Sequence, residues 1–443
     1  MIDIKIIRKY PEKFKKAAID KHFDVDIDRL LEVDSKLSYT KKQLQDIYTT
    51  KNRLGKSIPK LSGDKKKSAL AELSQLKQNE AQLADEVKTL QPELDELMLQ
   101  VAQPPDDNVP IGKDETENVE IRKEGKVRKF DFQPKDHIQL GTALDIIDIE
   151  RGVKLAGTRN YILKGDGALL HWAVLRFAMD FMVGKGYVPM SVPVLMKDEA
   201  MTGTGFFPGS EDQTYRMQKD GLNLAGTAEV PLTAFHSGEI LSAEQLPLKY
   251  FALSTCFRRE AGAAGKDTYG LYRIHQFDKV EQVVICRNSV EESNKFHEEI
   301  LANAEAVMAA LELPYRVVNV CTGDLGRGQA KKFDIEAWMP SRNAYCETHS
   351  ASKLYDFQAR RLNIRYKDKP GPRATSHGTR FCHTLNNTVI ASPRILIPIL
   401  ELYQNADGSV TIPKVLRPYI YPVRDCITKN RRQKSKISTC GSP

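Results

Sequence analysis

The residues best suited to chemistry begin in the segment Cys256-Phe-Arg-Arg-Glu260, which directly follows an apolar run over residues 250–255. Such a run is typical of a β-strand, and side chains two positions apart on a strand point to the same face. We therefore expect Arg258 and Glu260 to project together. A guanidinium there could hold a phosphate and a carboxylate at once, and Glu260 could accept hydrogen bonds from an adenine amino group or bind a second cation. The segment predicts an anion-binding position at the end of a strand.

A second strand-like run follows after a glycine-rich loop over residues 261–270. His275 in this run could serve as a base, but a structural hydrogen-bonding role is favoured. The glycines of the loop could form a phosphate-binding nest, although loop flexibility explains them equally well. Five side chains share one parity and are expected on one face of the strand: Arg273, His275, Phe277, Lys279 and Glu281.

Oxygen donors and a further arginine lie in two later segments. Glu347 and Ser350 occur in Cys346-Glu-Thr-His-Ser350 and are suited to Mg²⁺, which proteins usually share with substrate phosphates. Arg394 precedes an apolar, helix-like run over residues 395–401. Its charge would add to the field of the helix N-terminus, so Arg394 is predicted to bind a triphosphate.

Cysteine and histidine residues near these segments raise the hypothesis of a zinc site. The candidates are Cys346, His349, Cys382 and His383, but the last two are adjacent and the spacing fits a tetrahedral site poorly. No zinc is expected. The run Asp-Phe-Gln-Ala-Arg-Arg over residues 356–361 is interpreted as a strand whose ion pairs support the site, in preference to a catalytic segment.

A helical arm is predicted in the first hundred residues. Residues 27–54 carry apolar positions at near-heptad spacing, and Pro59 and Gly63 favour a turn after them. A second heptad stretch follows over residues 73–101, and Glu80 alone breaks its apolar pattern. This second stretch repeats over four heptads, at Leu76, Leu83, Leu90 and Leu97 and, on the companion seam, at Leu73, Val87, Leu94 and Val101. The two stretches predict an antiparallel helical hairpin with helices about 45 Å long, rather than a coiled coil between two chains.

The excess of positive charge is concentrated on this arm. The whole chain has a formal net charge of +8, and residues 41–67 contain nine Lys or Arg against two acids, Asp46 and Asp64. A local basic block favours a polyanion partner, because neutralising phosphates drives such binding. The alternative is a solvated, lysine-rich helix face.

Composition limits the class of protein. A chain of 443 residues exceeds one ordinary core and suggests two or three domains. No stretch reaches about 18 uninterrupted apolar residues, and the N-terminus has no secretory pattern. The seven cysteines have no disulfide-framework spacing. We therefore predict a cytoplasmic protein with no membrane partner.

Three segments resemble the signature motifs of class II aminoacyl-tRNA synthetases. The run from Leu169 into Gly186-Tyr-Val-Pro-Met-Ser-Val-Pro193 is similar to the first motif, a dimer-interface element. Phe257-Arg-Arg-Glu260 is similar to the second motif, and the segment that ends in Arg394 is similar to the third.

Within that class the chain resembles the seryl-tRNA synthetase family of bacterial type. The resemblance extends from Met1 to about Tyr419, and the two-helix arm is also what that family places at its N-terminus. Four stretches carry it: Gly226-Thr-Ala-Glu-Val-Pro-Leu-Thr233, residues 257–281, Glu347-Thr-His-Ser350 with residues 356–365, and Thr384-Leu-Asn-Asn-Thr388 to Arg394.

The resemblance implies an α+β fold, with a class II synthetase antiparallel β-sheet flanked by helices and an N-terminal antiparallel α-helical coiled-coil arm. The predicted domains are a tRNA-binding domain over residues 1–101 and a catalytic domain over 119–419. Composition predicts a linker over 102–118 and a basic, disordered tail over 420–443, and the tail has no counterpart in the family. The implied activity is serine–tRNA ligation, in which L-serine reacts with ATP in the presence of Mg²⁺ and is then transferred to tRNA-Ser. A homodimer is implied, and charging of tRNA-Sec stays open.

The resemblance also implies roles for individual residues. Arg258 and Arg394 are the expected catalytic pair, and Glu347 and Ser350 the expected Mg²⁺ ligands. The expected serine-binding residues are Thr227, Ala228, Glu229, Arg258, Glu281, Asn386 and Thr388. The expected ATP-binding residues are Arg258, Arg259, Glu260, Arg273, Ile274, Phe277, Glu347, Thr348, His349, Ser350 and Arg394. The expected tRNA-binding residues are Lys41, Lys42, Lys51, Arg53 and Lys56.

Two positions depart from the family pattern. Tyr269 stands where an arginine is expected, and Phe206 replaces a polar residue in a loop over the site.

Two rival functions remain. One rival is a paralogue that loads a carrier protein, which the intact basic arm argues against. The other is a non-catalytic RNA-binding relative, which would be free to lose Arg258, Glu281 or Arg394.

Overall fold

The computed structural model describes residues 1–262, 265, 267–367 and 378–429 of the chain. Contacts between residues divide the chain into two compact units, Met1–Pro104 and Pro105–Pro443. Each unit buries apolar side chains of its own.

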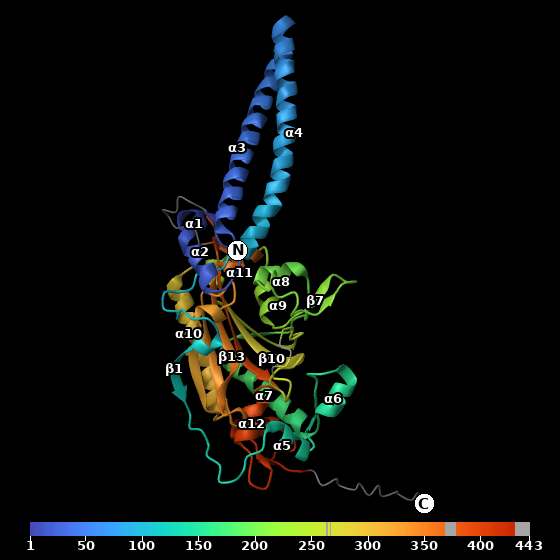
Figure 1. Ribbon diagram of the computed structural model, residues 1–443, viewed down its shortest axis with the longest axis vertical. Helices are drawn as coiled ribbons and strands as arrows, with labels where there is room; N and C mark the ends of the chain where they lie inside the picture. Colours follow the sequence, from blue (N-terminus) through green and yellow to red (C-terminus); the bar gives the residue numbers. More distant parts are fainter. Residues whose placement is uncertain (263–264, 266, 368–377, 430–443) are drawn as a thin grey trace, which may run out of the picture. The chain divides into compact units, whose positions relative to one another are not determined.

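The N-terminal unit contains the predicted helical hairpin, which the structure confirms. Two short helices, α1 (Ile4–Lys9) and α2 (Pro11–Asp20), precede the long helices α3 (Ile27–Ser57) and α4 (Gly63–Gln100) (Figure 1). The Asp26 side chain accepts a hydrogen bond from the backbone N–H of Arg29 at 2.8 Å. This N-cap explains why α3 begins at Ile27. The turn passes through η1 (Ile58–Lys60).

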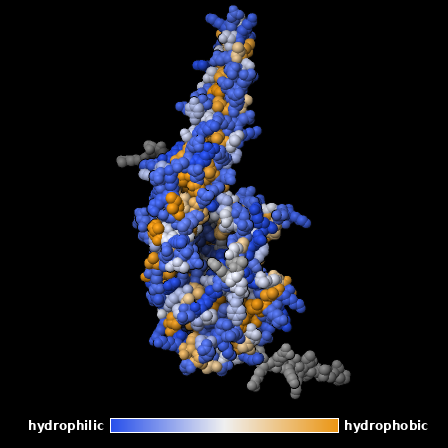
Figure 2. Space-filling view, viewed as in Figure 1, coloured by the Kyte–Doolittle hydropathy of each residue, from blue (hydrophilic) through white to orange (hydrophobic). Residues whose placement is uncertain are grey.

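The seam between α3 and α4 follows the heptad pattern. Glu80, the polar break in that pattern, forms an ion pair with Lys51 of α3, so its charge is compensated within the hairpin. Figure 2 shows hydrophilic side chains over most of the hairpin surface and hydrophobic ones in a narrow stripe along it. Val33, Leu37 and Leu90 are buried, with Val87, Leu94 and Leu97 packed against them.

The C-terminal unit is built on an eight-stranded sheet in the order β1-β11-β12-β13-β16-β10-β9-β4. Neighbouring strands are antiparallel except for β4, which pairs parallel with β9 at one edge. The predicted antiparallel class of sheet is therefore confirmed. The strands are β1 (Val119–Glu124), β4 (Val188–Met190), β9 (Leu248–Phe257), β10 (Gln276–Cys286), β11 (Tyr315–Asn319), β12 (Lys331–Met339), β13 (Ala344–Tyr355) and β16 (His383–Ser392).

Helices cover the sheet and supply its core. α7 (Asp166–Gly184) and α10 (Val290–Ala310) lie against it (Figure 1), and α5 (His137–Ala143) and α12 (Leu396–Leu402) pack nearby. Among the described helices, α7 alone is long and apolar enough to cross a membrane by length and composition. Leu170, Val174 and Ala178 of this helix are nevertheless buried in the protein core, as expected for a core helix.

Strand register brings polar residues from separate strands together. Glu281 of β10 pairs with Thr388 of β16, and the pairing of these strands shifts by a β-bulge between Val280 and Glu281. Asn386 of β16 pairs with Ser352 of β13. Residues paired across a sheet project to the same face, so this register gathers carboxylate, amide and hydroxyl groups over the central strands.

Smaller elements surround the central sheet. The remaining helices are α6 (Ile149–Ala156), α8 (Asp198–Thr204), α9 (Glu229–Ala234) and α11 (Phe357–Leu362), with 3₁₀ turns η2 (Glu115–Glu117), η3 (Ala243–Gln245), η4 (Thr322–Asp324), η5 (Pro340–Arg342) and η6 (Lys414–Tyr419). The remaining strands are β2 (Ile147–Asp148), β3 (Ile162–Leu163), β5 (Leu195–Met196), β6 (Arg216–Met217), β7 (Leu222–Leu224), β8 (Ile240–Ser242), β14 (Arg365–Lys367), β15 (Arg380–Phe381), β17 (Val410–Thr411) and β18 (Cys426–Ile427).

Two predictions about these outer segments need correction. Residues 356–361 were expected to form a strand, but Phe357–Leu362 form helix α11, and Arg360 pairs with the N-cap residue Asp356 at the i,i+4 spacing of a helix. A disordered tail was expected from residue 420, but β18 pairs with β17 and Ile420 and Ile427 are buried. Residues 430–443 of that predicted tail lie outside the described residues.

Part of the predicted linker is held by the C-terminal unit. Asp106 forms an ion pair with Lys353 at 2.5 Å and accepts a hydrogen bond from the Tyr355 hydroxyl at 2.8 Å. The backbone N–H of Gly112 donates to the Thr322 hydroxyl at 3.2 Å. Residues 106–112 are therefore tied to the unit that they precede.

Candidate active site

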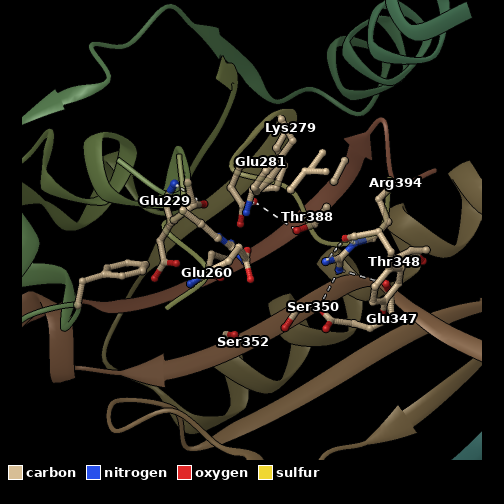
Figure 3. Close-up of a pocket in the computed structure, with 18 of the residues that line it drawn as sticks. Glu229, Glu260, Lys279, Glu281, Glu347, Thr348, Ser350, Ser352, Thr388 and Arg394 are labelled. Atoms are coloured by element: carbon tan, nitrogen blue, oxygen red, sulfur yellow. Dashed lines mark hydrogen bonds and ion pairs between the residues drawn. The ribbon is translucent and has the colours of Figure 1, made fainter. Parts of the chain in front are cut away.

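Residues of strands β10, β13 and β16 and of the loops beside them line a polar cavity (Figure 3). Its empty volume is about 820 Å³ when the open mouth is included. The predicted binding residues that line it are Thr227, Glu229, Arg258, Glu260, Ile274, Phe277, Glu281, Glu347, Thr348, Ser350, Asn386, Thr388 and Arg394.

Four predicted residues are not part of this lining. Ala228 is fully buried, and the backbone N–H of Arg259 donates to the Gln213 carbonyl at 2.9 Å. Arg273 is connected to the lining through Glu260, to which its guanidinium donates a hydrogen bond at 3.0 Å. His349 is buried, and burial lowers the pKa of its imidazole to about 4. The ring is therefore a neutral part of the sheet, bonded to the Val389 carbonyl at 3.0 Å.

The strand-parity prediction is correct for only part of this lining. Phe277, Lys279 and Glu281 share a face of β10 and line the cavity. Strand β10 begins at Gln276, however, so Arg273 and His275 precede it. Strand β9 likewise ends at Phe257. Arg258 and Glu260 lie beyond it, and Glu260 has a positive φ of 53°. The loop conformation, rather than strand alternation, brings these two side chains to the cavity.

One end of the cavity is acidic and hydroxylated. Glu281 is buried, forms an ion pair with Lys279 at 2.5 Å, and lies 3.5 Å from the Thr388 hydroxyl, a long contact for a hydrogen bond. Thr227 and Asn386 are also buried polar residues of this lining. Figure 3 shows Glu281, Lys279 and Thr388 close together. Such a group could bind a small molecule that carries both an ammonium and a hydroxyl.

The second carboxylate at this end belongs to Glu229. Burial, and then repulsion by Glu281, raise the pKa of Glu229 to about 7. Glu229 begins helix α9, and its carboxylate accepts a hydrogen bond from the Gln358 side-chain amide at 2.8 Å. The pair of carboxylates is thus built to favour a cation between them.

Arg258 provides a cation beside an aromatic ring. Its guanidinium carbon lies 5.2 Å from the centroid of the Phe277 ring. Two of its nitrogens lie 3.4 Å from the Gly226 carbonyl, which is long for a hydrogen bond. Because these contacts hold the exposed side chain only weakly, the guanidinium can turn toward an anionic ligand.

Arg394 is fixed more firmly, by backbone carbonyls and a stacked ring. Its Nε and Nη2 donate to the Tyr272 carbonyl at 3.2 and 3.1 Å, and its Nη1 donates to the Glu347 carbonyl at 3.2 Å. The Tyr272 ring lies between two guanidiniums, with Arg394 at 4.4 Å and Arg342 at 4.1 Å from its centroid. Arg394 itself precedes the N-cap of α12, Ile395. This bracing presents a fixed positive charge to the cavity.

Oxygen donors lie next to Arg394 on strand β13. Glu347 and Ser350 line the cavity, and the Glu347 carboxylate is 4.0 Å from the Arg394 guanidinium. Partial loss of hydration in the cavity wall would raise the pKa of Glu347, whose side chain is 47% exposed, but the charges of Arg394, Lys332 and Arg258 hold that pKa below its usual range. The carboxylate is therefore ionised. In the described part of the chain, no group of three or more His, Cys, Asp and Glu side chains could hold a metal by itself.

The prediction of site residues missed several that line the cavity. Tyr272 and Leu271 lie in the loop before β10, Ser352 is on β13, and Gln329 precedes β12. Lys279 and Phe206 also line it, although no binding role was predicted for either. Ser352 follows Ser350 at the strand period, which is a signal that could have identified it. No local pattern in the sequence marks Gln329, because only the fold brings its loop to the cavity.

Comparisons with known proteins agree with this geometry. Residues 1–105 match the model of the seryl-tRNA synthetase N-terminal domain, and residues 213–403 match the tRNA synthetase class II core domain (G, H, P, S and T). A serine–tRNA ligase of Deinococcus radiodurans is 44% identical, over 95% of this chain and 97% of that protein. A serine–tRNA ligase of Dictyoglomus turgidum is 42% identical, over 95% of this chain and 98% of that protein.

Solved structures give the same result. The crystal structure of seryl-tRNA synthetase from Pyrococcus horikoshii complexed with ATP has a TM-score of 0.90 and 38% identity, and the match covers 97% of this chain and all of that one. The cytoplasmic serine–tRNA ligase of Naegleria fowleri in complex with AMP has a TM-score of 0.86 and 32% identity, covering 97% and 99% of the two chains. The sequence, the class II sheet and these full-length relatives agree, and the chain belongs to the seryl-tRNA synthetase family.

Proposed function

We propose that the cavity is where this chain, a serine–tRNA ligase by its family, joins L-serine to ATP and then passes the serine to the 3′ end of tRNA-Ser. The supporting observation is that Arg258 and Arg394 line the same cavity as Glu281 and Thr388. Cations that can neutralise phosphates are thus combined with a polar pocket that suits a small hydroxylated amino acid. Attack of a carboxylate on a phosphate needs the two anions brought together and their charge neutralised, rather than a protein nucleophile.

The acidic end is the proposed serine pocket. The serine ammonium would bind Glu281 and Glu229, and its hydroxyl would bind Thr388 and Glu281, with Thr227, Ala228 and Asn386 completing the pocket. These polar groups would lose hydrogen bonds with alanine in place of serine, and a buried site of this kind discriminates strongly against the analogue that lacks the hydroxyl.

The other end of the cavity is the proposed ATP site. Arg258 would bridge the serine carboxylate and the α-phosphate, while Glu260 would bind the adenine amino group and Phe277 would stack on the base. Arg394, fixed by Tyr272, and Arg273 would neutralise the β- and γ-phosphates. Arg259, Ile274, Thr348 and His349 are proposed to support the nucleotide. Pyrophosphate leaves as the serine carboxylate oxygen bonds to the α-phosphorus.

Glu347 and Ser350 are the proposed protein ligands of Mg²⁺. Both are oxygen donors, and the ionised state of Glu347 suits a divalent cation. Mg²⁺ usually keeps waters and takes substrate phosphates as ligands, so two protein ligands beside the ATP site are sufficient. The ion would supply positive charge to the phosphates. No zinc is included in the proposal.

The hairpin is the proposed binding surface for the tRNA. Lys42, Arg53 and Lys56 are exposed on α3. Lys41 donates a hydrogen bond to the Gln91 side chain at 2.6 Å, and Lys51 is paired with Glu80. We therefore expect Lys42, Arg53 and Lys56 to contribute more than Lys41, which is exposed but hydrogen-bonded, and Lys51. Contacts of this type bind phosphates and recognise the shape of structured RNA.

A homodimer formed through α7 and the edge strand β4 is also proposed. Trp172 and Val183 of α7 are 62% and 53% exposed, and Val188 of β4 is 53% exposed. In the described part of the chain, strand β4 is at the end of the sheet and pairs only with β9. Large exposed apolar side chains beside an edge strand favour a protein partner.

A cytoplasmic location is also proposed, because the six described cysteines are free.

ATP–pyrophosphate exchange, measured with each of the twenty amino acids, tests the proposed site. We expect exchange with serine and at most trace exchange with alanine, threonine or cysteine. Exchange driven best by another amino acid would refute the serine pocket. Charging of tRNA-Ser and of tRNA-Sec, compared with loading of a carrier protein, then identifies the acceptor.

A further inference from the structure

Helix α11 carries a buried amide that reaches the proposed serine pocket. Gln358 has no exposed surface. Its Nε2 donates hydrogen bonds to the Glu229 carboxylate at 2.8 Å and to the Thr204 carbonyl at 3.0 Å. Its Oε1 accepts a hydrogen bond from the Thr384 hydroxyl at 2.7 Å. One side chain thus connects α8, α9 and β16.

These partners fix the orientation of the amide. The Thr204 carbonyl can only accept a hydrogen bond, so Nε2 must face it. A flipped amide would place Oε1 against that carbonyl and would leave Nε2 facing the Thr384 hydroxyl. Because both N–H groups are used, Gln358 holds the Glu229 carboxylate by one defined hydrogen bond.

Helix α11 is itself a firm support. A Cβ atom added at Gly203 of α8 would lie 2.1 Å from Leu362 Cδ2 of α11, so the two helices are in close contact. Arg361 donates to the carbonyls of Thr202 at 2.9 Å and Phe207 at 3.1 Å. These bonds tie α11 to the loop that carries Phe206 to the cavity wall.

The Glu229 carboxylate benefits from such a support because it lines the cavity near a second carboxylate, that of Glu281. Glu229 is half-buried, and repulsion by Glu281 would push its carboxylate away from the pocket. The bond from Gln358 engages Oε1 and leaves Oε2 for a ligand. Figure 3 shows Glu229 on the same side of the cavity as Glu281.

We propose that Gln358 is a positioning residue that orients Glu229 toward the ammonium group of the amino-acid substrate. This inference rests on the proposed function, which assigns Glu229 to serine binding. It gives the Asp-Phe-Gln-Ala-Arg-Arg segment, whose catalytic role was doubtful, a defined part in selecting the amino acid.

The test is Gln358→Met, which keeps the volume and removes the amide. The KM values for serine and for ATP are measured separately by pyrophosphate exchange. We expect the KM for serine to rise about 10- to 100-fold, the range for losing a hydrogen bond to a charged group. The KM for ATP should stay within about twofold, since none of the Gln358 contacts is with the proposed ATP residues.

Gln282→Met is the matched control. Gln282 is also fully buried, donates to the Ile300 carbonyl at 3.0 Å and accepts from the Asn303 amide at 3.0 Å, but it is not part of the cavity lining. Its loss should lower the melting temperature and leave the KM for serine within about twofold. Should Gln358→Met fail to fold, Thr384→Val removes the group that holds Oε1 and should raise the KM for serine about two- to fivefold.

A double-mutant cycle separates positioning from a general structural effect. If Gln358 acts through Glu229, Gln358→Met should have little further effect on the KM for serine in a Glu229→Ala background. Equal effects in both backgrounds, or an unchanged KM for serine in Gln358→Met, would overturn the inference. Absence of serine-dependent exchange by the unmodified protein would instead refute the proposed function.

Discussion

At the scale of single residues, the cavity combines two carboxylates that differ in their surroundings. Glu281 is paired with Lys279 at 2.5 Å, whereas Glu229 is held by the neutral amide of Gln358. A cation partner favours the ionised form, and burial without one favours the protonated form. The pKa of Glu229 is accordingly raised to about 7, so its charge changes within the working pH range of most enzymes.

This difference predicts a pH dependence of serine binding. The ionised form of Glu229 binds an ammonium, so the KM for serine should fall about tenfold between about pH 6 and about pH 8. Exchange rates at a series of serine concentrations across this range provide the measurement, and Glu229→Gln should flatten the dependence. The same dependence in Glu229→Gln would show that another group titrates.

The same pKa determines how Glu229 contributes to stability. Its folded-state pKa is above the unfolded value, so the folded protein keeps a proton between about pH 4.5 and about pH 7 that the unfolded chain has lost. The contribution of Glu229 to the free energy of unfolding therefore falls as the pH rises through that window and is constant above it.

Arg258 is predicted to be essential for adenylate formation and dispensable for folding. Its side chain is exposed and its bonds to Gly226 are long, so Arg258→Ala should leave the melting temperature nearly unchanged. Removing a cation from the reacting phosphate should lower the serine-dependent exchange rate at least about 100- to 1000-fold. Calorimetry measures the melting temperature, and the exchange assay measures adenylate formation. A near-normal exchange rate in Arg258→Ala would refute the assigned role.

At the scale of elements, the hairpin uses charge for two purposes. Arg29–Glu93 at 2.6 Å and Lys36–Glu86 at 2.9 Å connect α3 to α4, as does the Lys51–Glu80 pair. Other cations of α3 are exposed and are candidates for tRNA contacts. Exposed ion pairs contribute little stability, so we attribute the stability of the hairpin mainly to its apolar seam.

The separation of ion-paired from other exposed cations predicts which substitutions on the hairpin weaken tRNA binding. Changing Lys42, Arg53 and Lys56 together to alanine should raise the KM for tRNA about 10- to 100-fold and weaken the salt dependence of tRNA binding. Serine-dependent exchange should be unchanged. Aminoacylation at several salt concentrations provides the measurement. A triple alanine variant at Lys16, Lys126 and Lys129, outside α3 and α4, is the control and should retain normal tRNA binding. An equal loss of tRNA affinity in both variants would contradict a specific role for the hairpin.

At the scale of the whole molecule, assembly is expected to occur through α7. The inner face of this helix contributes Leu170, Val174 and Ala178 to the core, while Trp172 and Val183 are exposed. The exposed face also carries the Arg176–Asp180 ion pair, but its large apolar side chains favour a protein partner. The exposed face would be covered in a homodimer.

Trp172→Asp is therefore predicted to produce monomers. An exposed charge costs the isolated chain little, but in an interface it would be buried without a partner. Light scattering after size-exclusion chromatography measures the change in mass. Ile19→Asp serves as the control, because Ile19 is 74% exposed on α2 and is not part of the proposed interface. A dimer that persists in Trp172→Asp would contradict the assignment of this face.

The sequence by itself determined the features that depend on local periodicity. The heptads specify the hairpin because residues seven apart face one side of a helix, and strand alternation correctly groups Phe277, Lys279 and Glu281. These patterns need only the geometry of one element. They failed where the chain leaves its regular element, at Arg258, Glu260 and Arg273.

Only the tertiary structure decided which distant segments meet. The pairing of Glu281 with Thr388 depends on strand register. The Tyr272 ring contacts both Arg342 and Arg394, although Tyr272 and Arg394 are 122 residues apart in the sequence. The bond from Gln358 to Glu229 spans 129 residues. Such contacts are set by packing and register across the whole core, and no short stretch of sequence encodes them.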